Sequence, residues 1–369
     1  MIHISEPSVG VPEIKAISKV IRTKILASGK TVEQFEKSFD GFLEKKTNHS
    51  IAVANGTVAL QSALWALNLK PTDQVLTTAF SFIATANSIF HAGLKPCFAD
   101  IESQTFNLSP AEVKKILNKS SSKNIKAILV VHLYGHPALM DELMDISRKK
   151  GIPLIEDCAQ AHGATYDGRK VGTFGLVSTF SFYATKNLSM GEGGMICTAN
   201  SRIEALIRSY INHGRGTHGH ELLGYNFRTT NLLASIGLVQ LKYLEERNAS
   251  RRKFAKIYNA ILGGIKYLTL PQELIECKHV YHQYTIQTPY RMGLMKYLKN
   301  SGIESKIFYP RIIPEEIFYK NMGYGKERYP IAESISRSCL SIPVHPGLSE
   351  TQIEMIAKKI RSFFKKQIN

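Results

Sequence analysis

The sequence predicts an α/β protein with a mixed, mostly parallel sheet and a smaller α/β domain at its C-terminal end. Three observations predict this fold. Short β-rich runs alternate with helical patterns through the first two-thirds of the chain, the alternation changes after a long helical stretch, and 369 residues suit two domains better than one core. We expect a large domain at 1–245, whose N-terminal segment packs on the other domain, and a small domain at 246–369.

The elements of the large domain follow from its apolar runs. A strand is expected at Ile51–Ala54, and apolar residues then recur at helical spacing over Val58–Leu69. A helix over Pro137–Lys150 ends at Gly151, a residue suited to a helix C-terminal cap. Further strands are predicted at Gln74–Thr78, Lys126–Leu133, Ile152–Cys158, Val177–Tyr183 and Met195–Thr198.

The C-terminal third begins with a long helix, expected from Leu232 to about Phe254. The last helix begins with a capping-box pair, Ser349 and Gln352, followed by an apolar stripe. Between these helices the pattern predicts a strand, a helix and a strand, at Val280–Thr288, Met292–Asn300 and Ile303–Tyr309.

The composition bounds the class of partner. A net charge of +17, from 47 Lys and Arg against 30 Asp and Glu, favours nucleic acid, an acidic membrane surface or a phosphorylated small molecule. The basic residues are spread along the chain with no nucleic-acid-binding motif, and no apolar run approaches the roughly 20 residues of a membrane span. Five widely separated cysteines and no visible secretory signal predict a cytoplasmic protein with reduced thiols.

Two turns of the predicted sheet carry polar residues suited to a ligand. A strand runs into Asn55-Gly56-Thr57 and a helix starts at once, so unpaired N–H groups and a glycine could cradle a phosphate. Taken alone, such a turn is more often plain α/β structure. Asp157 ends an apolar strand, where open sheets bind ligands, and Gln160 lies one helical turn beyond. This aspartate is either a loop-bonding residue or the partner of a cationic ligand.

Lys186 is the third candidate. It lies between an apolar strand and the Gly-rich segment at 191–196, with no other charge until Glu192. A lysine is usually a solvated surface residue. In a desolvated, electropositive site its pKa falls, and the neutral amine can form a Schiff base.

Seven motifs occur in order along the chain. They are NGT at 55–57, SFIATAN at 81–87, HLYGHP at 132–137, EDCAQAHGA at 156–164, SFYATKN at 181–187, GYNFR at 224–228 and IPVHPGL at 342–348. In this order and spacing the set resembles the DegT/DnrJ/EryC1/StrS sugar aminotransferase family, from residue 7 to the last helix. The resemblance implies the aspartate-aminotransferase-like fold, fold type I, of enzymes that use pyridoxal phosphate (PLP).

The resemblance also implies roles for individual residues. Lys186 would form a Schiff base with PLP and move the proton between substrate carbon and cofactor carbon, while Asp157 would hold the pyridine nitrogen protonated. Gln160 would hydrogen-bond the ring hydroxyl and Phe82 would stack on the ring. The cofactor phosphate would be bound by Gly56, Thr57 and Ser181, and by Asn226 of the partner subunit, which implies a homodimer.

The implied reaction is the amination of a nucleotide-linked keto-deoxy sugar, with L-glutamate as amino donor, for a surface glycan. Lys186 favours amine transfer, because family members that only remove a hydroxyl carry His there. The opening PSVGVPE at 7–13 resembles members acting at C4 of the hexose. Amination at C3 or of an aminocyclitol ketone stays open, and a basic nucleic-acid-binding protein is the non-enzymatic alternative.

Substrate contacts are expected from His213, Arg228 and Tyr309. Each residue also has a purely structural interpretation: His213 as a loop residue, Arg228 as part of a surface salt bridge and Tyr309 as a half-buried strand tyrosine. No metal site is predicted, since the histidines of 213–220 have no carboxylate or thiol ligand beside them. Two departures from the family pattern concern the sugar rather than PLP: Thr229 stands where Met is usual, and RIIPEE follows Pro310 where a His is often found.

Overall fold

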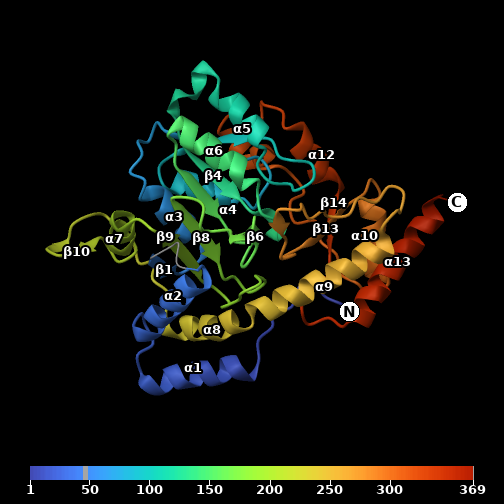
Figure 1. Ribbon diagram of the computed structural model, residues 1–369, viewed down its shortest axis with the longest axis horizontal. Coiled ribbons are helices and arrows are strands. Elements are labelled where there is room, and N and C mark those ends of the chain that lie inside the picture. The colour runs from blue at the N-terminus through green and yellow to red at the C-terminus, as the bar shows by residue number, and fades with distance from the viewer. Residues whose placement is uncertain (45–48, 369) are drawn as a thin grey trace.

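A seven-stranded sheet lies at the centre of the larger part of the molecule in the computed structural model, which describes residues 1–44 and 49–368 (Figure 1). Residues 45–48 and 369, which belong to the two predicted domains, lie outside the described residues. The strand order is β1-β9-β8-β5-β4-β2-β3, and only β9 runs against the others. The strands are β1 (His49–Val53), β2 (Gln74–Thr78), β3 (Lys95–Ala99), β4 (Ile125–Val131), β5 (Leu154–Asp157), β8 (Val177–Ser181) and β9 (Gly194–Thr198).

Helices cover both faces of this sheet, which is why its strands are almost continuously apolar. Alternate residues of one strand enter different clusters: Phe180 packs on one face with α2, and Val177 packs on the other with α3 and α7. α8 shares the α2 face, and α1 packs on α8. These helices are α1 (Val11–Thr23), α2 (Lys30–Phe42), α3 (Gly56–Trp65), α4 (Ala84–His91), α5 (Pro110–Leu117), α6 (Met140–Lys150), α7 (Ser201–Tyr210) and α8 (Asn231–Lys242).

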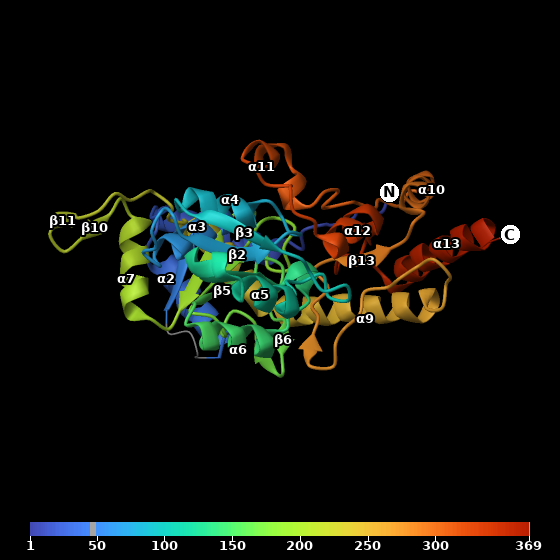
Figure 2. The same cartoon turned by 90° about the horizontal axis from the view of Figure 1, so that it is seen from above.

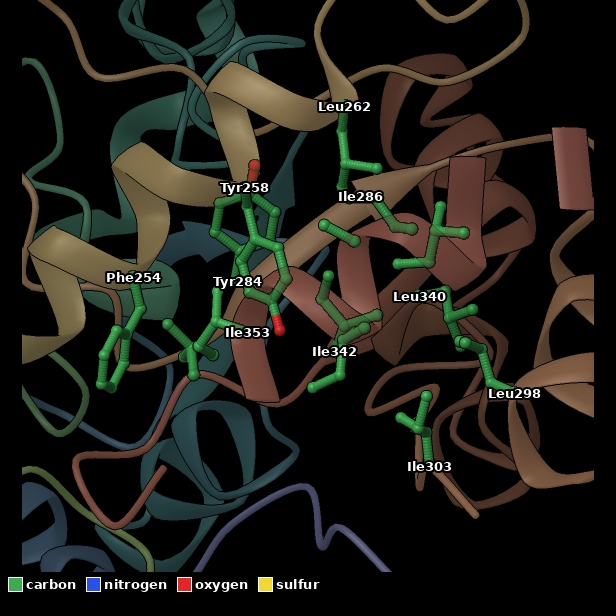
Figure 3. Close-up of a cluster of buried hydrophobic side chains, with 14 of the residues drawn as sticks. Phe254, Tyr258, Leu262, Tyr284, Ile286, Leu298, Ile303, Leu340, Ile342 and Ile353 are labelled. Carbon is green, nitrogen blue, oxygen red and sulfur yellow. The ribbon is translucent and has the colours of Figure 1, made fainter. Parts of the chain in front are cut away.

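The long helix α9 (Leu244–Leu262) leads away from the sheet, and α13 (Glu350–Ile368) packs along it (Figures 1 and 2). Together with the antiparallel pair β13 (Tyr284–Gln287) and β14 (Cys339–Ile342), these helices enclose a cluster of buried side chains that all come from residue 254 onward (Figure 3). The remaining helices of this part are α10 (Arg291–Asn300), α11 (Ile317–Asn321) and α12 (Pro330–Ser338).

The two parts of the molecule are joined by contacts between segments that lie far apart in the sequence. Ile2 donates its N–H to the carbonyl of Gly302 at 2.8 Å and accepts from the N–H of Glu304 at 2.8 Å. Segment 309–339 packs in turn on the sheet region, where Tyr309 and Tyr319 join one cluster with Phe80. The division of the chain at residues 245 and 246 stays a prediction.

Short elements complete the fold. The hairpin β10 (Arg215–Gly216) and β11 (Gly219–His220) projects from the body beyond α7 (Figure 2). The other short elements are β6 (Thr165–Tyr166), β7 (Arg169–Lys170) and β12 (Cys277–Lys278), which pair in one small sheet, and the 3-10 turns Ser120–Asn124, Leu133–Gly135 and Ile313–Glu315. Among the described residues, no helix is long and apolar enough to cross a membrane.

Several predicted elements are confirmed and two are wrong. The strand at Gln74–Thr78 has the predicted bounds, and the Ser349–Gln352 capping box forms through reciprocal hydrogen bonds of 2.9 and 3.2 Å. The helix expected at 232–254 is two helices, because the backbone at Tyr243 (φ −101°, ψ 1°) leaves the helical geometry without a Gly or Pro to mark it. Residues 303–309 form only two isolated bridges, from Ile303 to Ile2 and from Lys306 to Ser341 of β14, and these do not extend into a continuous strand.

Candidate active site

The predicted site residues follow strands that run in the same direction, so they reach one edge of the sheet. Gly56 follows β1, Asp157 ends β5, and Lys186 follows β8. Phe82 comes after β2, two residues before α4, and is 58% exposed. The carboxyl edge of the sheet therefore gathers these four residues.

Gly56, in the turn between β1 and α3, has no room for a side chain. A Cβ on Gly56 would lie 2.7 Å from Cβ of Ser181, closer than real Cβ contacts come. Asn55 caps α3 by accepting a hydrogen bond from the N–H of Val58 at 3.0 Å. The first-turn N–H groups of Gly56 and Thr57 therefore remain for an anion beside the Ser181 hydroxyl, at the positive end of the helix dipole.

The carboxylate of Asp157 is buried and held in one orientation. Its Oδ1 accepts from the N–H of Ala159 at 3.1 Å, and its Oδ2 accepts from the Thr85 hydroxyl at 3.1 Å. The Thr85 hydroxyl in turn contacts that of Ser81 at 3.0 Å. Burial raises the pKa of Asp157, while these donors and the charge of Lys186 oppose the rise. A cationic ring nitrogen beside Asp157 would favour its ionised form.

Lys186 carries a reactive amine. Burial lowers its pKa to about 8, although the charge of Asp157 pulls the pKa the other way. Its Nζ forms no hydrogen bond or ion pair with any residue that the structure describes. Near neutral pH a sizeable fraction of this amine is neutral, which is the form that attacks an aldehyde.

The residue after Lys186 is anchored on three sides. The Asn187 amide donates to Oδ1 of Asn248 at 2.8 Å and to the carbonyl of Val280 at 3.2 Å. Its oxygen lies 3.1 Å from Nδ1 of His282, which must donate to it. Because α9 and the segment before β13 supply these partners, the backbone next to Lys186 is fixed to the C-terminal part of the chain.

His162 lies within the same region as a neutral imidazole. Its ring packs against Phe180 and Phe182, with centroids 5.6 and 5.7 Å away. Burial, and then the charge of Lys186, lowers the pKa of His162 to about 3, and neither ring nitrogen has a hydrogen-bond partner among the described residues. The His162 side of Lys186 is therefore buried and carries no charge.

Gln160 and Tyr309 are buried together, with Nε2 of Gln160 donating to the Tyr309 hydroxyl at 2.7 Å. The other predicted contacts are His213, Arg228 and Asn226, of which Arg228 forms an isolated bridge with Val53 at the end of β1. His213 is exposed at the base of the projecting hairpin, and Arg228 hydrogen-bonds Oδ1 of Asn212. The exposed Asn226 pairs with Asn212, and none of these three residues forms a hydrogen bond or ion pair with Lys186 of its own chain.

The buried side chains of His132, Glu156 and Cys158 are of types that bind metal ions, but the ligand atoms of His132 and Glu156 already form hydrogen bonds within the protein. Oε1 of Glu156 accepts from the N–H groups of Phe174 and Gly175 at 2.7 and 2.6 Å, and Oε2 accepts from Gly172 at 2.7 Å. Nδ1 of His132 accepts from the N–H of Ala138, so its protonated Nε2 faces Glu156 at 3.2 Å. We therefore assign this cluster to holding the 172–175 loop.

A lysine of lowered pKa, a buried carboxylate and an anion-binding helix turn meet at the carboxyl edge of a sheet with one reversed strand. This combination defines an enzyme of the PLP-dependent transferase class. The family profile described as "DegT/DnrJ/EryC1/StrS aminotransferase family" matches residues 7–361, and the chain belongs to this family. It is a sugar aminotransferase.

Similar proteins cover almost the whole chain. GDP-perosamine synthase of Vibrio cholerae is 35% identical, with 99% of each chain covered. UDP-N-acetyl-3-dehydro-alpha-D-glucosamine 3-aminotransferase of Acidithiobacillus ferrooxidans is 38% identical over 85% of this chain and 84% of its own. The crystal structure of S. venezuelae DesV in complex with a ketimine intermediate superposes with a TM-score of 0.91 at 32% identity, covering 96% of this chain and 94% of DesV.

The cofactor of this family is PLP, and the site fits it. Lys186 offers to an aldehyde an amine that has no partner among the described residues, and Asp157 offers a buried carboxylate to a pyridine nitrogen. The start of α3 presents the N–H groups of Gly56 and Thr57 beside the Ser181 hydroxyl for a phosphate. Sequence reasoning missed Thr85 and Ser81, although both lie in the SFIATAN motif and their spacing of four places two hydroxyls side by side.

Proposed function

We propose that this protein is a homodimeric, cytoplasmic enzyme that moves an amino group from L-glutamate to C4 of a nucleotide-linked keto-deoxy sugar, for surface-glycan synthesis. The observation that carries the proposal is the Lys186 amine, which has a lowered pKa and no partner among the described residues, beside the buried carboxylate of Asp157. PLP, once bound, supplies an electron-accepting ring for cleavage of a bond at the amine-bearing carbon.

Each predicted cofactor residue keeps a role in this proposal. Asp157, steadied by Thr85, holds the ring nitrogen in its cationic form through charge pairing in a desolvated site. Gln160 would donate a hydrogen bond to the ring hydroxyl oxygen, and the exposed ring of Phe82 would stack on the cofactor ring. The phosphate is bound by Gly56, Thr57 and Ser181, together with Asn226 of the partner subunit.

Lys186 also moves the proton. A group transfers protons best when its pKa lies close to the working pH, and burial brings that of Lys186 to about 8. The neutral amine can take a proton from one carbon and deliver it to another on the same face of the substrate. Three hydrogen bonds hold the side chain of Asn187 in place. The Lys186 amine therefore moves by rotation about its own side-chain bonds and not by movement of the neighbouring backbone.

Exposed apolar side chains support the homodimer. Val11, Ile14 and Ile21 of α1, with Ile25 just after it, recur at spacings of three, four and seven and are each at least half exposed. Such a stripe on a helix whose other side already packs on α8 suits a second copy of the chain. The exposed position of Asn226 likewise suits a site in the partner rather than in its own chain.

The sugar carbon is the finer part of the proposal. Support for C4 comes from the PSVGVPE opening at 7–13. The name of the Acidithiobacillus relative, a 3-aminotransferase, favours C3 as the second candidate. In either case Arg228 and His213 are the proposed contacts to substrate or donor, and the positive charge of the chain suits a diphosphate.

The test is to incubate the purified protein with glutamate and a panel of dTDP-, UDP- and GDP-linked 3-keto and 4-keto sugars, and to detect amino sugars by mass spectrometry. We expect product from a 4-keto sugar, and none with Lys186→Ala. Product only from 3-keto sugars would refute the C4 assignment. Lack of product from the entire panel would refute the substrate class, and salt-dependent DNA binding by a protein that forms no visible adduct with PLP would favour the nucleic-acid alternative.

A further inference from the structure

The side-chain amide of Gln160 is held by two partners. Its Oε1 accepts a hydrogen bond from the backbone N–H of Tyr134 at 2.7 Å, and its Nε2 donates to the Tyr309 hydroxyl at 2.7 Å. A backbone N–H can only donate, so it must face the amide oxygen. This contact fixes which way round the amide lies, and its NH2 group must point toward Tyr309.

Tyr309 is rigidly placed to accept that hydrogen bond. Its ring stacks on Tyr134, with centroids 5.8 Å apart and planes 18° apart, and meets Phe80 edge-on at 5.5 Å. Only 7% of the residue is exposed, and burial raises the pKa of Tyr309, so its hydroxyl stays protonated. Two aromatic contacts therefore set the position of one oxygen atom.

The contact leaves one hydrogen of the Gln160 NH2 group without an acceptor among the described residues. An amide held at both heavy atoms loses little further rotational freedom when this remaining hydrogen binds a ligand. An amide held only through its oxygen could turn about its side-chain torsions, and ligand binding would then have to restrict that motion.

We propose that Tyr309 is a positioning residue, which acts through Gln160 by aiming the free N–H of its amide at the ring hydroxyl oxygen of PLP. The inference rests on the proposed role of Gln160, and it replaces the expected substrate contact of Tyr309 with a cofactor-directed one. It also gives segment 309–339, which lies far from the cofactor residues in sequence, a direct link to the cofactor site.

The first test compares Tyr309→Phe with a matched control, Tyr319→Phe. Both tyrosines are buried in the same aromatic cluster, but the Tyr319 hydroxyl bonds Oδ1 of Asn87 at 2.7 Å instead of Gln160. The readout is the dissociation constant for PLP, from titration of apoprotein followed by visible absorbance. We expect PLP to bind Y309F about 3- to 10-fold more weakly, the effect of one net hydrogen bond. Y319F should bind PLP like the wild type.

The second test is a double-mutant cycle with Gln160→Ala. If Tyr309 acts through Gln160, the Y309F change should have almost no further effect on PLP affinity in the Q160A protein. The pH dependence of the visible band should likewise shift in Y309F and Q160A but not in Y319F. Each of these results supports the inference.

Two results would overturn it. One is an undiminished Y309F effect in the Q160A background, which would assign Tyr309 a direct contact with a ligand. The other is an unchanged PLP affinity in Y309F with a raised KM for the sugar alone. Failure of the proposed function looks different, because the wild-type protein itself would then form no visible adduct with PLP or transfer no amine.

Discussion

The lowered pKa of Lys186 predicts an unusual pH profile for its reactivity. An ordinary lysine amine has a pKa of 10.5, whereas burial brings that of Lys186 to about 8. At pH 8 about half of the Lys186 amine is neutral, against about 0.3% for the ordinary value, so its neutral population is about 150-fold larger. Since only the neutral form attacks a carbonyl, this ratio carries over to the rate, reduced by restricted access.

The assay is reductive methylation of apoprotein with formaldehyde and cyanoborohydride, read for each lysine by peptide mass spectrometry. The modification rate of Lys186 should rise about tenfold per pH unit below pH 8 and then level off, while the rate of the exposed lysines as a group keeps rising toward pH 10. Prior addition of PLP should block Lys186 alone. A Lys186 rate that climbs in parallel with the exposed lysines through pH 9 would refute the reasoning.

Three further predictions concern neighbouring positions. Gly56→Ala should lower the free energy of unfolding by about 1–3 kcal/mol through overpacking, and it should weaken PLP binding. The control Gly41→Ala, in open space on α2, should have neither effect. Urea unfolding measures the stability, and PLP titration measures the affinity. Thr85→Val should cost PLP binding about 1.5–3 kcal/mol by removing a hydrogen bond to a charged group, and Thr85→Ser should restore it; equal affinities for T85V and wild type would contradict the role given to Thr85. Between about pH 8 and 10.5 the unfolded chain binds more protons at Lys186 than the folded chain does. The unfolding free energy of the apoprotein, measured by urea titration, should therefore rise across that window by up to about 3 kcal/mol. The Lys186→Met variant should lack this rise.

The sequence was sufficient for the polar edge of the sheet and for its strands except β3, at one edge of the sheet, which was not predicted. Apolar runs marked β2 and β5 because both faces of the sheet are buried, and the residue that ends each strand then falls at one edge. The family resemblance supplied the roles of Lys186 and Asp157, which the structure brings together at that edge.

Contacts between distant segments could not be predicted in the same way. No local pattern shows that the Tyr309 hydroxyl meets Gln160, 149 positions earlier, and the expected contact of Tyr309 with substrate stays a prediction. The break at Tyr243 was missed for a related reason. Helical periodicity continues through it, and the two helices are separated by the torsion angles of one ordinary residue.

Glu156 and Asp157 are consecutive carboxylates at the end of β5, and they have different roles. Side chains alternate along a strand, so one of them anchors the 172–175 loop while its neighbour serves the cofactor edge. Inserting or deleting a single residue within β5 would therefore exchange the two, placing the wrong acid in each environment at once. Length changes in this stretch of the chain should abolish both folding and catalysis, and no compensating substitution at one position could rescue them.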